Sequence, residues 1–130
     1  MLEGKVSDMI VSRDKVPYTL PFEGLERRVL ATNELIMLVE HVMEEGSVFP
    51  MHSHPHEQIG YLLEGKLRVI CGGQEFYLEA GDSFAVAGGV EHQVFALERS
   101  IALDFITPAR EDYAQEVEAL REKSENHKGA

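Results

Sequence analysis

The sequence of 130 residues predicts one all-β domain, a sandwich or barrel, followed by a single C-terminal α-helix. From residue 35 onward, short segments rich in β-forming residues follow one another at close spacing. Between them lie EGK, GGQ, EAGD and AGGVE, which offer glycine or an acidic residue where a tight turn requires positive φ. Short strands joined by such turns are typical of a sandwich or barrel.

The chain divides into three parts, taken here in order. Residues 1–30 lack sustained periodicity and hold Pro17 and Pro21 close together, which predicts an N-terminal arm of extended pieces with one short strand at most. Residues 35–106 form the predicted β-barrel. Its strands are expected at residues 35–42, 48–54, 58–63, 66–71, 75–78, 83–86, 92–95 and 101–106. Residues 108–124 form the predicted helix.

The helix is predicted from an apolar stripe. Tyr113, Val117 and Leu120 recur at i, i+4 and i+7 and therefore share one helical face. Thr107 suits an N-cap, and Pro108 suits the first helical position. The stripe predicts that the helix packs on the outside of the barrel.

Charge and composition limit the kinds of molecule that this protein can be expected to bind. Twelve basic against 23 acidic residues give a net charge of −11, which argues against nucleic acid or anionic lipid as the main partner. A small anionic substrate bound at a locally positive site is still compatible with this net charge. No segment approaches the ~18 apolar residues of a membrane span. The first residues lack the apolar run of a signal peptide, so we expect a cytoplasmic protein with no membrane partner. Cys71 is the only cysteine, which excludes an internal disulfide.

Three of the six histidines fall within five positions, in the stretch HSHPHEQIGYLLEG. In a strand, residues i and i+2 point to the same side, so His52 and His54 would project together as half of a metal site. Pro55 interrupts the strand, so His56 need not share that face and its role stays open. His92, after a glycine-rich turn, could supply another ligand. The alternative is an isolated surface His-x-His pair that binds nothing.

The spacing of these residues resembles the cupin family, whose two motifs are G-x5-H-x-H-x3,4-E-x6-G and G-x5-P-x-G-x2-H-x3-N. The matching positions are, in order, Gly46, His52, His54, Gln58, Gly65, Gly81, Gly89 and His92. Every spacing in the first motif agrees. The resemblance spans residues 35–106 and implies a cupin-type double-stranded β-helix, that is, a jelly-roll barrel.

The resemblance also implies a divalent metal ion. Its implied ligands are His52, His54, Gln58 and His92. Gln58 stands where the family has glutamate, while Ala87 and Ala96 replace its proline and asparagine. Glu57 or a water-mediated contact in place of Gln58 is the alternative, although Glu57 should face the other way. Neutral ligands leave the ion its full +2 charge, which favours an anionic ligand. Zn, Ni, Mn and Fe all fit this ligand set.

One branch of the cupins is more similar still. The blocks HSHPHEQIGYLLEG, GDSFAVAGGVEHQV and LDFITPAREDY resemble the KdgF group of pectin and alginate degradation proteins. That resemblance implies an enzyme that ketonises 4,5-unsaturated uronate monomers, small anionic sugar acids, to the linear keto sugar acid. It further implies that Asp104 and Arg110 act as catalytic residues beside the metal. Ile106 stands where the group usually has phenylalanine, which bears on the sugar contact and on the identity of the substrate.

The residues themselves agree in outline with these roles. Asp104 shares a strand face with Ala102 and Ile106, and an inward aspartate could move a proton. Arg110, at the helix start, could bind a carboxylate with its planar guanidinium. The alternatives are a solvent-facing Asp104 and a solvated Arg110. His41 is interpreted as a structural or exposed strand histidine.

Other functions stay open at this point. They are a metal-dependent dioxygenase, a non-catalytic cupin that binds a sugar or anion or is merely structural, and a cyclase or isomerase that acts on another enolisable compound. Cupins commonly pair by exchanging or docking edge strands, and the N-terminal arm could do this. We therefore expect a homodimer.

Overall fold

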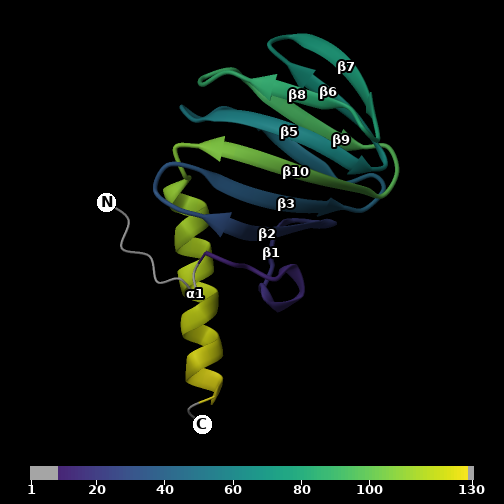
Figure 1. The fold of residues 1–130 in the computed structure, drawn as a ribbon. Helices are drawn as coiled ribbons and strands as arrows, with labels where there is room; N and C mark the ends of the chain where they lie inside the picture. The colour runs from purple at the N-terminus through teal and green to yellow at the C-terminus, as the bar shows by residue number, and fades with distance from the viewer. Residues whose placement is uncertain (1–8, 129–130) are drawn as a thin grey trace.

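The computed structural model describes residues 9–128, with side chains described for residues 9–120. After a short 3-10 turn at Arg13–Lys15, strands and one helix follow. Their bounds are β1 Thr19–Phe22, β2 Leu25–Thr32, β3 Met37–Met43, β4 Val48–His52, β5 Glu57–Glu64, β6 Lys66–Cys71, β7 Gln74–Glu79, β8 Ser83–Val86, β9 His92–Ala96, β10 Ser100–Thr107 and α1 Glu111–Lys128. The predicted all-β class with a C-terminal helix is confirmed (Figure 1).

The strands form two antiparallel sheets in a jelly-roll arrangement. One sheet has six strands in the order β1-β2-β3-β10-β5-β8, and the other has four in the order β4-β9-β6-β7. Strand β10 lies at the centre of the larger sheet, where Asp104 pairs with Val39 of β3 on one side and with Gly60 of β5 on the other. Helix α1 follows β10 and extends away from the end of the barrel (Figure 1).

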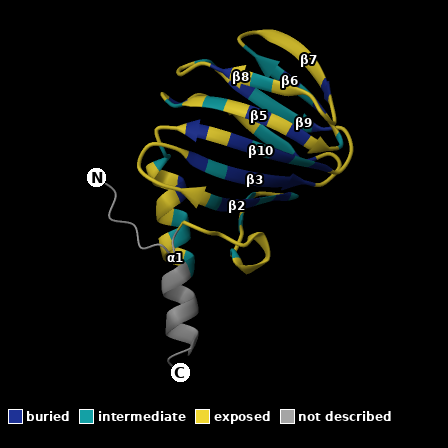
Figure 2. Ribbon diagram, in the orientation of Figure 1, coloured by how far each residue is buried: buried dark blue, intermediate teal, exposed yellow. Residues whose placement is uncertain are grey.

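The interior contains two apolar clusters. One lies between the sheets and includes Leu62 and Leu67, both at most 1% exposed. The other lies near the start of α1 and includes Met37, Ile106 and Tyr113. Each fully buried side chain of this kind contributes roughly 1.5–3 kcal/mol of hydrophobic stabilisation. Figure 2 shows the buried stretch of β3 and the alternation of buried and more exposed residues along β10.

A polar layer separates the two clusters. On β3, His41 lies between Val39 of the helix-side cluster and Met43 of the other. On β10, Asp104 likewise lies between Ala102 and Ile106. Both polar side chains are buried, His41 being 6% and Asp104 5% exposed. Burying two such groups is unfavourable unless they are hydrogen-bonded, so this layer is where a functional site is expected.

The N-terminal region differs from the prediction. Of the expected arm, residues 1–8 lie outside the described residues, and the rest contains two strands rather than one at most. Strand β2 pairs along β3 and buries Leu25, Arg27 and Val29. An arginine on the inward face disrupts the apolar alternation by which a strand is recognised in sequence. The prediction of extended pieces agrees with these strands but underestimated their number, and the charge of Arg27 that interrupts the apolar pattern is paired inside the fold.

The boundaries of other elements also shift. The strand predicted at 48–54 ends at His52, so His54 lies in the segment that connects β4 to β5. The helix predicted from residue 108 begins at Glu111. The hydroxyl of Thr107 donates to the carbonyl of Leu35 at 2.7 Å instead of capping a helix. Tyr113 and Val117 do pack against the helix-side cluster, as their spacing predicted. No helix within the described range is long and apolar enough to cross a membrane.

Candidate metal centre

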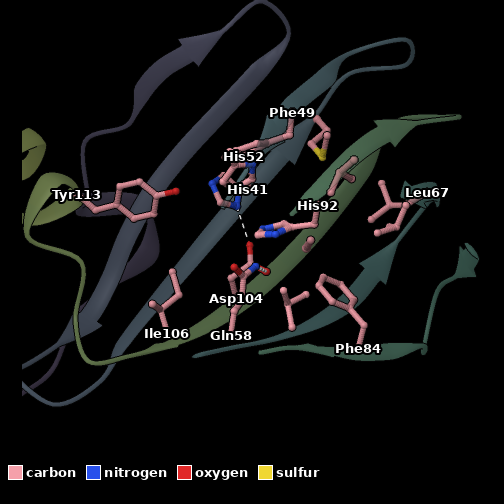
Figure 3. Close-up of a pocket in the computed structure, with 15 residues that line it drawn as sticks. His41, Phe49, His52, Gln58, Leu67, Phe84, His92, Asp104, Ile106 and Tyr113 are labelled. Atoms are coloured by element: carbon pink, nitrogen blue, oxygen red, sulfur yellow. Dashed lines mark hydrogen bonds and ion pairs between the residues drawn. The ribbon is translucent and has the colours of Figure 1, made fainter. Parts of the chain in front are cut away.

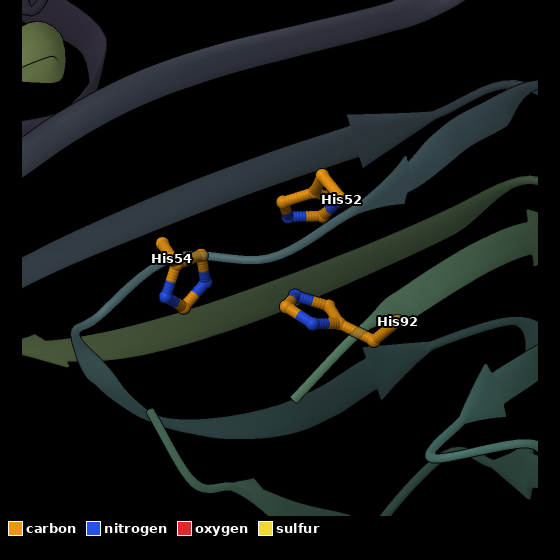
Figure 4. A group of neighbouring side chains, drawn as sticks. All are labelled: His52, His54 and His92. Carbon is orange, nitrogen blue, oxygen red and sulfur yellow. The ribbon is translucent and has the colours of Figure 1, made fainter. Parts of the chain in front are cut away.

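Three histidines from two parts of the chain meet at one end of the smaller sheet. His52 ends β4, His92 begins β9, and the two face each other in the antiparallel register. His54 joins them from the segment between β4 and β5. One ring nitrogen from each lies within 4.8 Å of the others (Figure 4). The sequence predicted the pair His52 and His54 and the return of His92, and the fold brings all three together.

Backbone carbonyls orient all three imidazoles in the same way. The Nδ1 atom of His52 lies 2.8 Å from the carbonyl oxygen of Pro50. The Nδ1 of His54 lies 3.0 Å from the carbonyl of His56, and that of His92 lies 2.9 Å from the carbonyl of Val90. A carbonyl oxygen only accepts, so these contacts assign the ring proton to Nδ1 and leave the Nε2 lone pair free. Such an arrangement is typical of histidines that bind a metal.

Gln58 brings an oxygen to the same place. It lies on β5, and its Oε1 is 3.1 Å from the Nε2 of His54. Its Nε2 donates to Oδ1 of Asp104 at 2.8 Å, which fixes which end of the amide faces the histidines. Glu57, the alternative ligand, faces the opposite side of the strand and accepts a hydrogen bond from the backbone nitrogen of Gly88.

These groups fit a divalent cation. With the protons assigned above, the Nε2 of His54 and the Oε1 of Gln58 are two acceptors in contact, which is unfavourable without a donor or a cation between them. The Nε2 of His92 is buried and has no hydrogen-bond partner within the described residues. Nitrogen and amide-oxygen donors suit several divalent first-row ions.

The surroundings favour the neutral form of His52 and His92. The pKa of His52 is lowered from 6.5 to about 4, mainly by burial and also by the neighbouring His92, His54 and Arg110, while the hydrogen bond to Pro50 acts in the opposite direction. Burial also lowers the pKa of His92, for which a hydrogen bond to Val90 acts in the opposite direction. Neutral imidazoles present the lone pairs that a metal requires.

Asp104 faces the interior, so the solvent-facing alternative does not hold. Its Oδ2 is 2.7 Å from Nδ1 of His41, and its Oδ1 accepts from Gln58 (Figure 3). Asp104, His52, Gln58 and His92 line the same internal cavity. Ile106 lines it as well and is only 2% exposed, whereas Phe105 points to the outer face. The face assigned to Asp104 from strand alternation is therefore the inner one.

Two residues of this site, His41 and Arg27, were not identified as functional from the sequence. His41 is buried rather than exposed, and its Nε2 accepts a hydrogen bond from Nε of Arg27 at 3.0 Å. The guanidinium of Arg27 lies 3.8 Å from the ring centroid of Tyr113 and pairs with Glu116 at 3.0 Å. The alternation of β3 places His41 on the same face as Val39 and Met43, which could have identified it as buried. No sequence signal pointed to Arg27.

Arg110 lies just before α1, beside an open cleft that His54 and His56 also line. Its guanidinium donates to both carboxylate oxygens of Asp112, at 3.1 and 2.6 Å, and to the hydroxyl of Tyr113 at 2.9 Å. These contacts use three of its five N–H groups and leave two for a ligand. Arg110 is partly buried and held in place, so the solvated alternative does not hold.

His56 lines the cleft rather than the metal centre. Its ring centroid is 5.6 Å from that of His54, and its carbonyl orients His54. Burial lowers the pKa of His56, and the positive charge of Arg110 adds to the effect.

Fold and site together define a class of protein. A two-sheet jelly roll with three histidines and a glutamine converging inside it is the arrangement expected of a cupin. The family model described as a cupin domain matches residues 39–106, which is more than half of the chain. The chain belongs to the cupin family.

Comparison with individual proteins shows which members of the cupin family this chain resembles. The pectin degradation protein KdgF of Dickeya dadantii (strain 3937) is 28% identical over 102 residues, which cover 77% of this chain and 93% of that protein. The structure of KdgF from Halomonas sp. matches with a TM-score of 0.76 at 28% identity, covering 80% of this chain and 96% of that one. An RmlC-like cupin from Shewanella frigidimarina NCIMB 400 matches with a TM-score of 0.77 at 32% identity, covering 80% and 94%. This chain is a cupin that resembles KdgF.

Proposed function

We propose that this cupin is a metal-dependent enzyme that ketonises 4,5-unsaturated uronate monomers from pectin or alginate breakdown to the linear keto sugar acid. The observation that carries the proposal is that the buried carboxylate of Asp104 lines the same cavity as His52 and His92. The relative named as a pectin degradation protein, and the likeness to the structure of KdgF from Halomonas sp., support the substrate class.

In this proposal His52, His54, Gln58 and His92 hold the divalent ion, which is Zn, Ni, Mn or Fe. When bound, the ion supplies Lewis-acid polarisation of a substrate oxygen. The four proposed ligands are neutral, so the site keeps a +2 charge that attracts an anionic sugar acid. This local charge supports an anionic substrate in a protein whose net charge is −11.

Asp104 carries the proton in the proposed reaction. Opening of the sugar ring breaks its C1–O5 bond and moves the proton of the C1 hydroxyl to O5, which leaves an aldehyde at C1 and an enol at C5. The conversion of that enol to a ketone removes the proton of the enol hydroxyl and adds one to C4, the carbon at the far end of the double bond. Nothing else enters or leaves, so one carboxylate that accepts and then returns a proton is sufficient. Both oxygens of Asp104 already accept hydrogen bonds, from His41 and Gln58, which hold the carboxylate in one orientation.

Arg110 binds the carboxylate of the substrate. Its two remaining N–H groups can donate to a carboxylate, and Asp112 and Tyr113 hold the guanidinium still. The cleft of about 1200 Å³ that Arg110 lines also reaches His54, and it is large enough for a monosaccharide. Ile106 lines the inner cavity with an aliphatic surface, so we propose that it contacts the sugar in place of an aromatic ring.

The homodimer and the cytoplasmic location stay predictions. Apolar side chains exposed on the outer face of β5 and β10, namely Ile59, Tyr61, Leu63 and Phe105, support self-association.

The proposed function is tested with monomeric unsaturated uronates, followed by ultraviolet absorbance of the conjugated double bond and by NMR of the product. Metal-loaded wild-type protein is compared with Asp104→Ala, with Asp14→Ala as an exposed aspartate control, and with a sample without protein. We expect faster loss of the double bond with wild type and with Asp14→Ala, but not with Asp104→Ala.

A wild-type rate equal to that of the sample without protein would overturn the proposal. Oxygen consumption with a catechol or flavonol would then favour a dioxygenase. Tight uronate binding without turnover would favour a binding module.

A further inference from the structure

A continuous chain of hydrogen bonds runs from helix α1 to the metal centre. Glu116 pairs with Arg27, Arg27 donates to His41, His41 contacts Asp104, and Asp104 accepts from Gln58. Gln58 then presents Oε1 to His54. The buried members lie between the two apolar clusters, where water does not compete for these bonds (Figure 3).

Each hydrogen bond in this chain has only one possible direction. A guanidinium donates and never accepts, so the contact from Nε of Arg27 makes Nε2 of His41 an acceptor. In a ring whose Nε2 accepts, the proton is on Nδ1, and it is donated to Oδ2 of Asp104 at 2.7 Å. An ionised carboxylate has no proton to offer, so Asp104 in that form accepts from the amide nitrogen of Gln58.

This direction decides which atom of Gln58 faces the histidines. An amide side chain has a donor end and an acceptor end of nearly equal shape, and only its partners choose between the two orientations. With the nitrogen bound to Asp104, the oxygen points toward His54. The reverse orientation would present an N–H group, which cannot bind a cation.

We propose that His41, held by Arg27, is a positioning residue that sets the orientation of the Gln58 amide and thereby the affinity of the site for its metal. The proposal rests on the ligand set of the proposed function but not on the uronate reaction. It also accounts for glutamine at position 58, because a glutamate there would set its carboxylate directly against that of Asp104.

The test measures metal affinity rather than activity. Metal-stripped wild-type protein, His41→Leu, His41→Asn and Val39→Ala are titrated with Co²⁺, and the heat and the visible absorption spectrum are followed. His41→Leu removes the donor to Asp104. In His41→Asn the amide nitrogen takes the place of Nδ1 and restores that donor. Val39→Ala is the matched control, because Val39 is fully buried on the same face of β3 but makes only apolar contacts.

We expect His41→Leu to bind Co²⁺ roughly ten- to a hundredfold more weakly than wild type, with an altered spectrum, because groups that orient ligands typically carry effects of this size. His41→Asn should recover most of the affinity. Val39→Ala should lower the melting temperature and leave affinity and spectrum unchanged. Wild-type affinity in His41→Leu, or an equal loss in Val39→Ala, would overturn the proposal.

A second measurement needs no variant, in case His41→Leu does not fold. Long-range ¹H–¹⁵N correlation spectra of metal-free wild-type protein distinguish the two neutral forms of a histidine ring. A neutral His41 protonated on Nδ1 would support the proposal, and one protonated on Nε2 would overturn it. If Co²⁺ binding responds to His41 as expected while uronates are not turned over, the proposed reaction fails and this inference stands.

Discussion

The amide of Gln58 and the carboxylate of Asp104 are joined by a hydrogen bond of 2.8 Å inside the barrel. Through this bond the proposed carrier of the proton also orients a proposed ligand of the metal. Substitutions at Asp104 should therefore affect both binding and turnover.

Asp104→Asn tests this double role. In this variant the one remaining side-chain oxygen would accept from His41, so the new amide nitrogen would face Gln58. That nitrogen donates, so the Gln58 amide would have to turn its oxygen toward it. We expect uronate turnover to fall about a hundredfold or more, as for loss of a general acid–base. Metal affinity should fall by roughly tenfold or more in calorimetric titration. Unchanged turnover would contradict the role of Asp104, and the exposed Asp14→Asn is the control.

Substitution of a histidine of the metal centre should lower the metal content of the protein, whereas substitution of the neighbouring His56 should not. His52→Ala and His92→Ala each remove one of the Nε2 atoms that converge, so the purified proteins should retain little metal in elemental analysis. His56→Ala should retain it, since the His56 ring lies beside the cleft. Equal metal content in all of these proteins would show that the ion binds elsewhere.

Arg110→Gln should weaken substrate binding more than it slows the reaction. Loss of a charged hydrogen-bond donor costs about 1.5–3 kcal/mol, so we expect KM to rise roughly ten- to a hundredfold with a smaller change in kcat. Arg99→Gln is the matched control, because Arg99 is an exposed arginine that pairs with Glu44. A fall in kcat at constant KM would assign Arg110 to the chemical step instead.

Gly60→Ala should destabilise the barrel beside the site. Gly60 lies opposite Asp104 in the sheet, and a Cβ at this position would approach the Phe84 ring to 2.1 Å. We expect a loss of about 1–3 kcal/mol in the free energy of unfolding, measured by denaturant titration. Adding Phe84→Leu, which makes room, should recover part of it. Full stability in Gly60→Ala would show that the ring moves aside without cost.

The metal-free protein should lose stability in mild acid. The pKa of His52 is lowered to about 4 from 6.5, mainly by burial, so between these values the unfolded chain binds a proton that the folded protein does not. The free energy of unfolding therefore falls as the pH decreases from 6.5 to about 4. Melting temperatures in chelator over this range should show the decline, and His52→Gln should make it shallower. A melting temperature independent of pH in wild type would contradict the shift.

Local patterns in the sequence were enough for much of the fold and for the histidines. Strand alternation and glycine-rich turns predicted the β-class, and the i, i+4, i+7 stripe predicted that Tyr113 and Val117 pack on the barrel. The resemblance of their spacing to the cupin motifs implied that His52, His54 and His92 meet, and they do. These features depend on periodicity and on intervals along the chain, which a single sequence carries.

Tertiary structure alone decided the electrostatics of the interior. Arg27 on β2, His41 on β3 and Asp104 on β10 are far apart in sequence, and only the strand order β2-β3-β10 brings them side by side. Whether a buried charge is tolerated depends on partners supplied by other strands. These partners cannot be read from the sequence, so the strand that contains Arg27 was not recognised there. The orientation of Gln58 follows from the same contacts, because an amide takes its direction from its neighbours and not from its position in the chain.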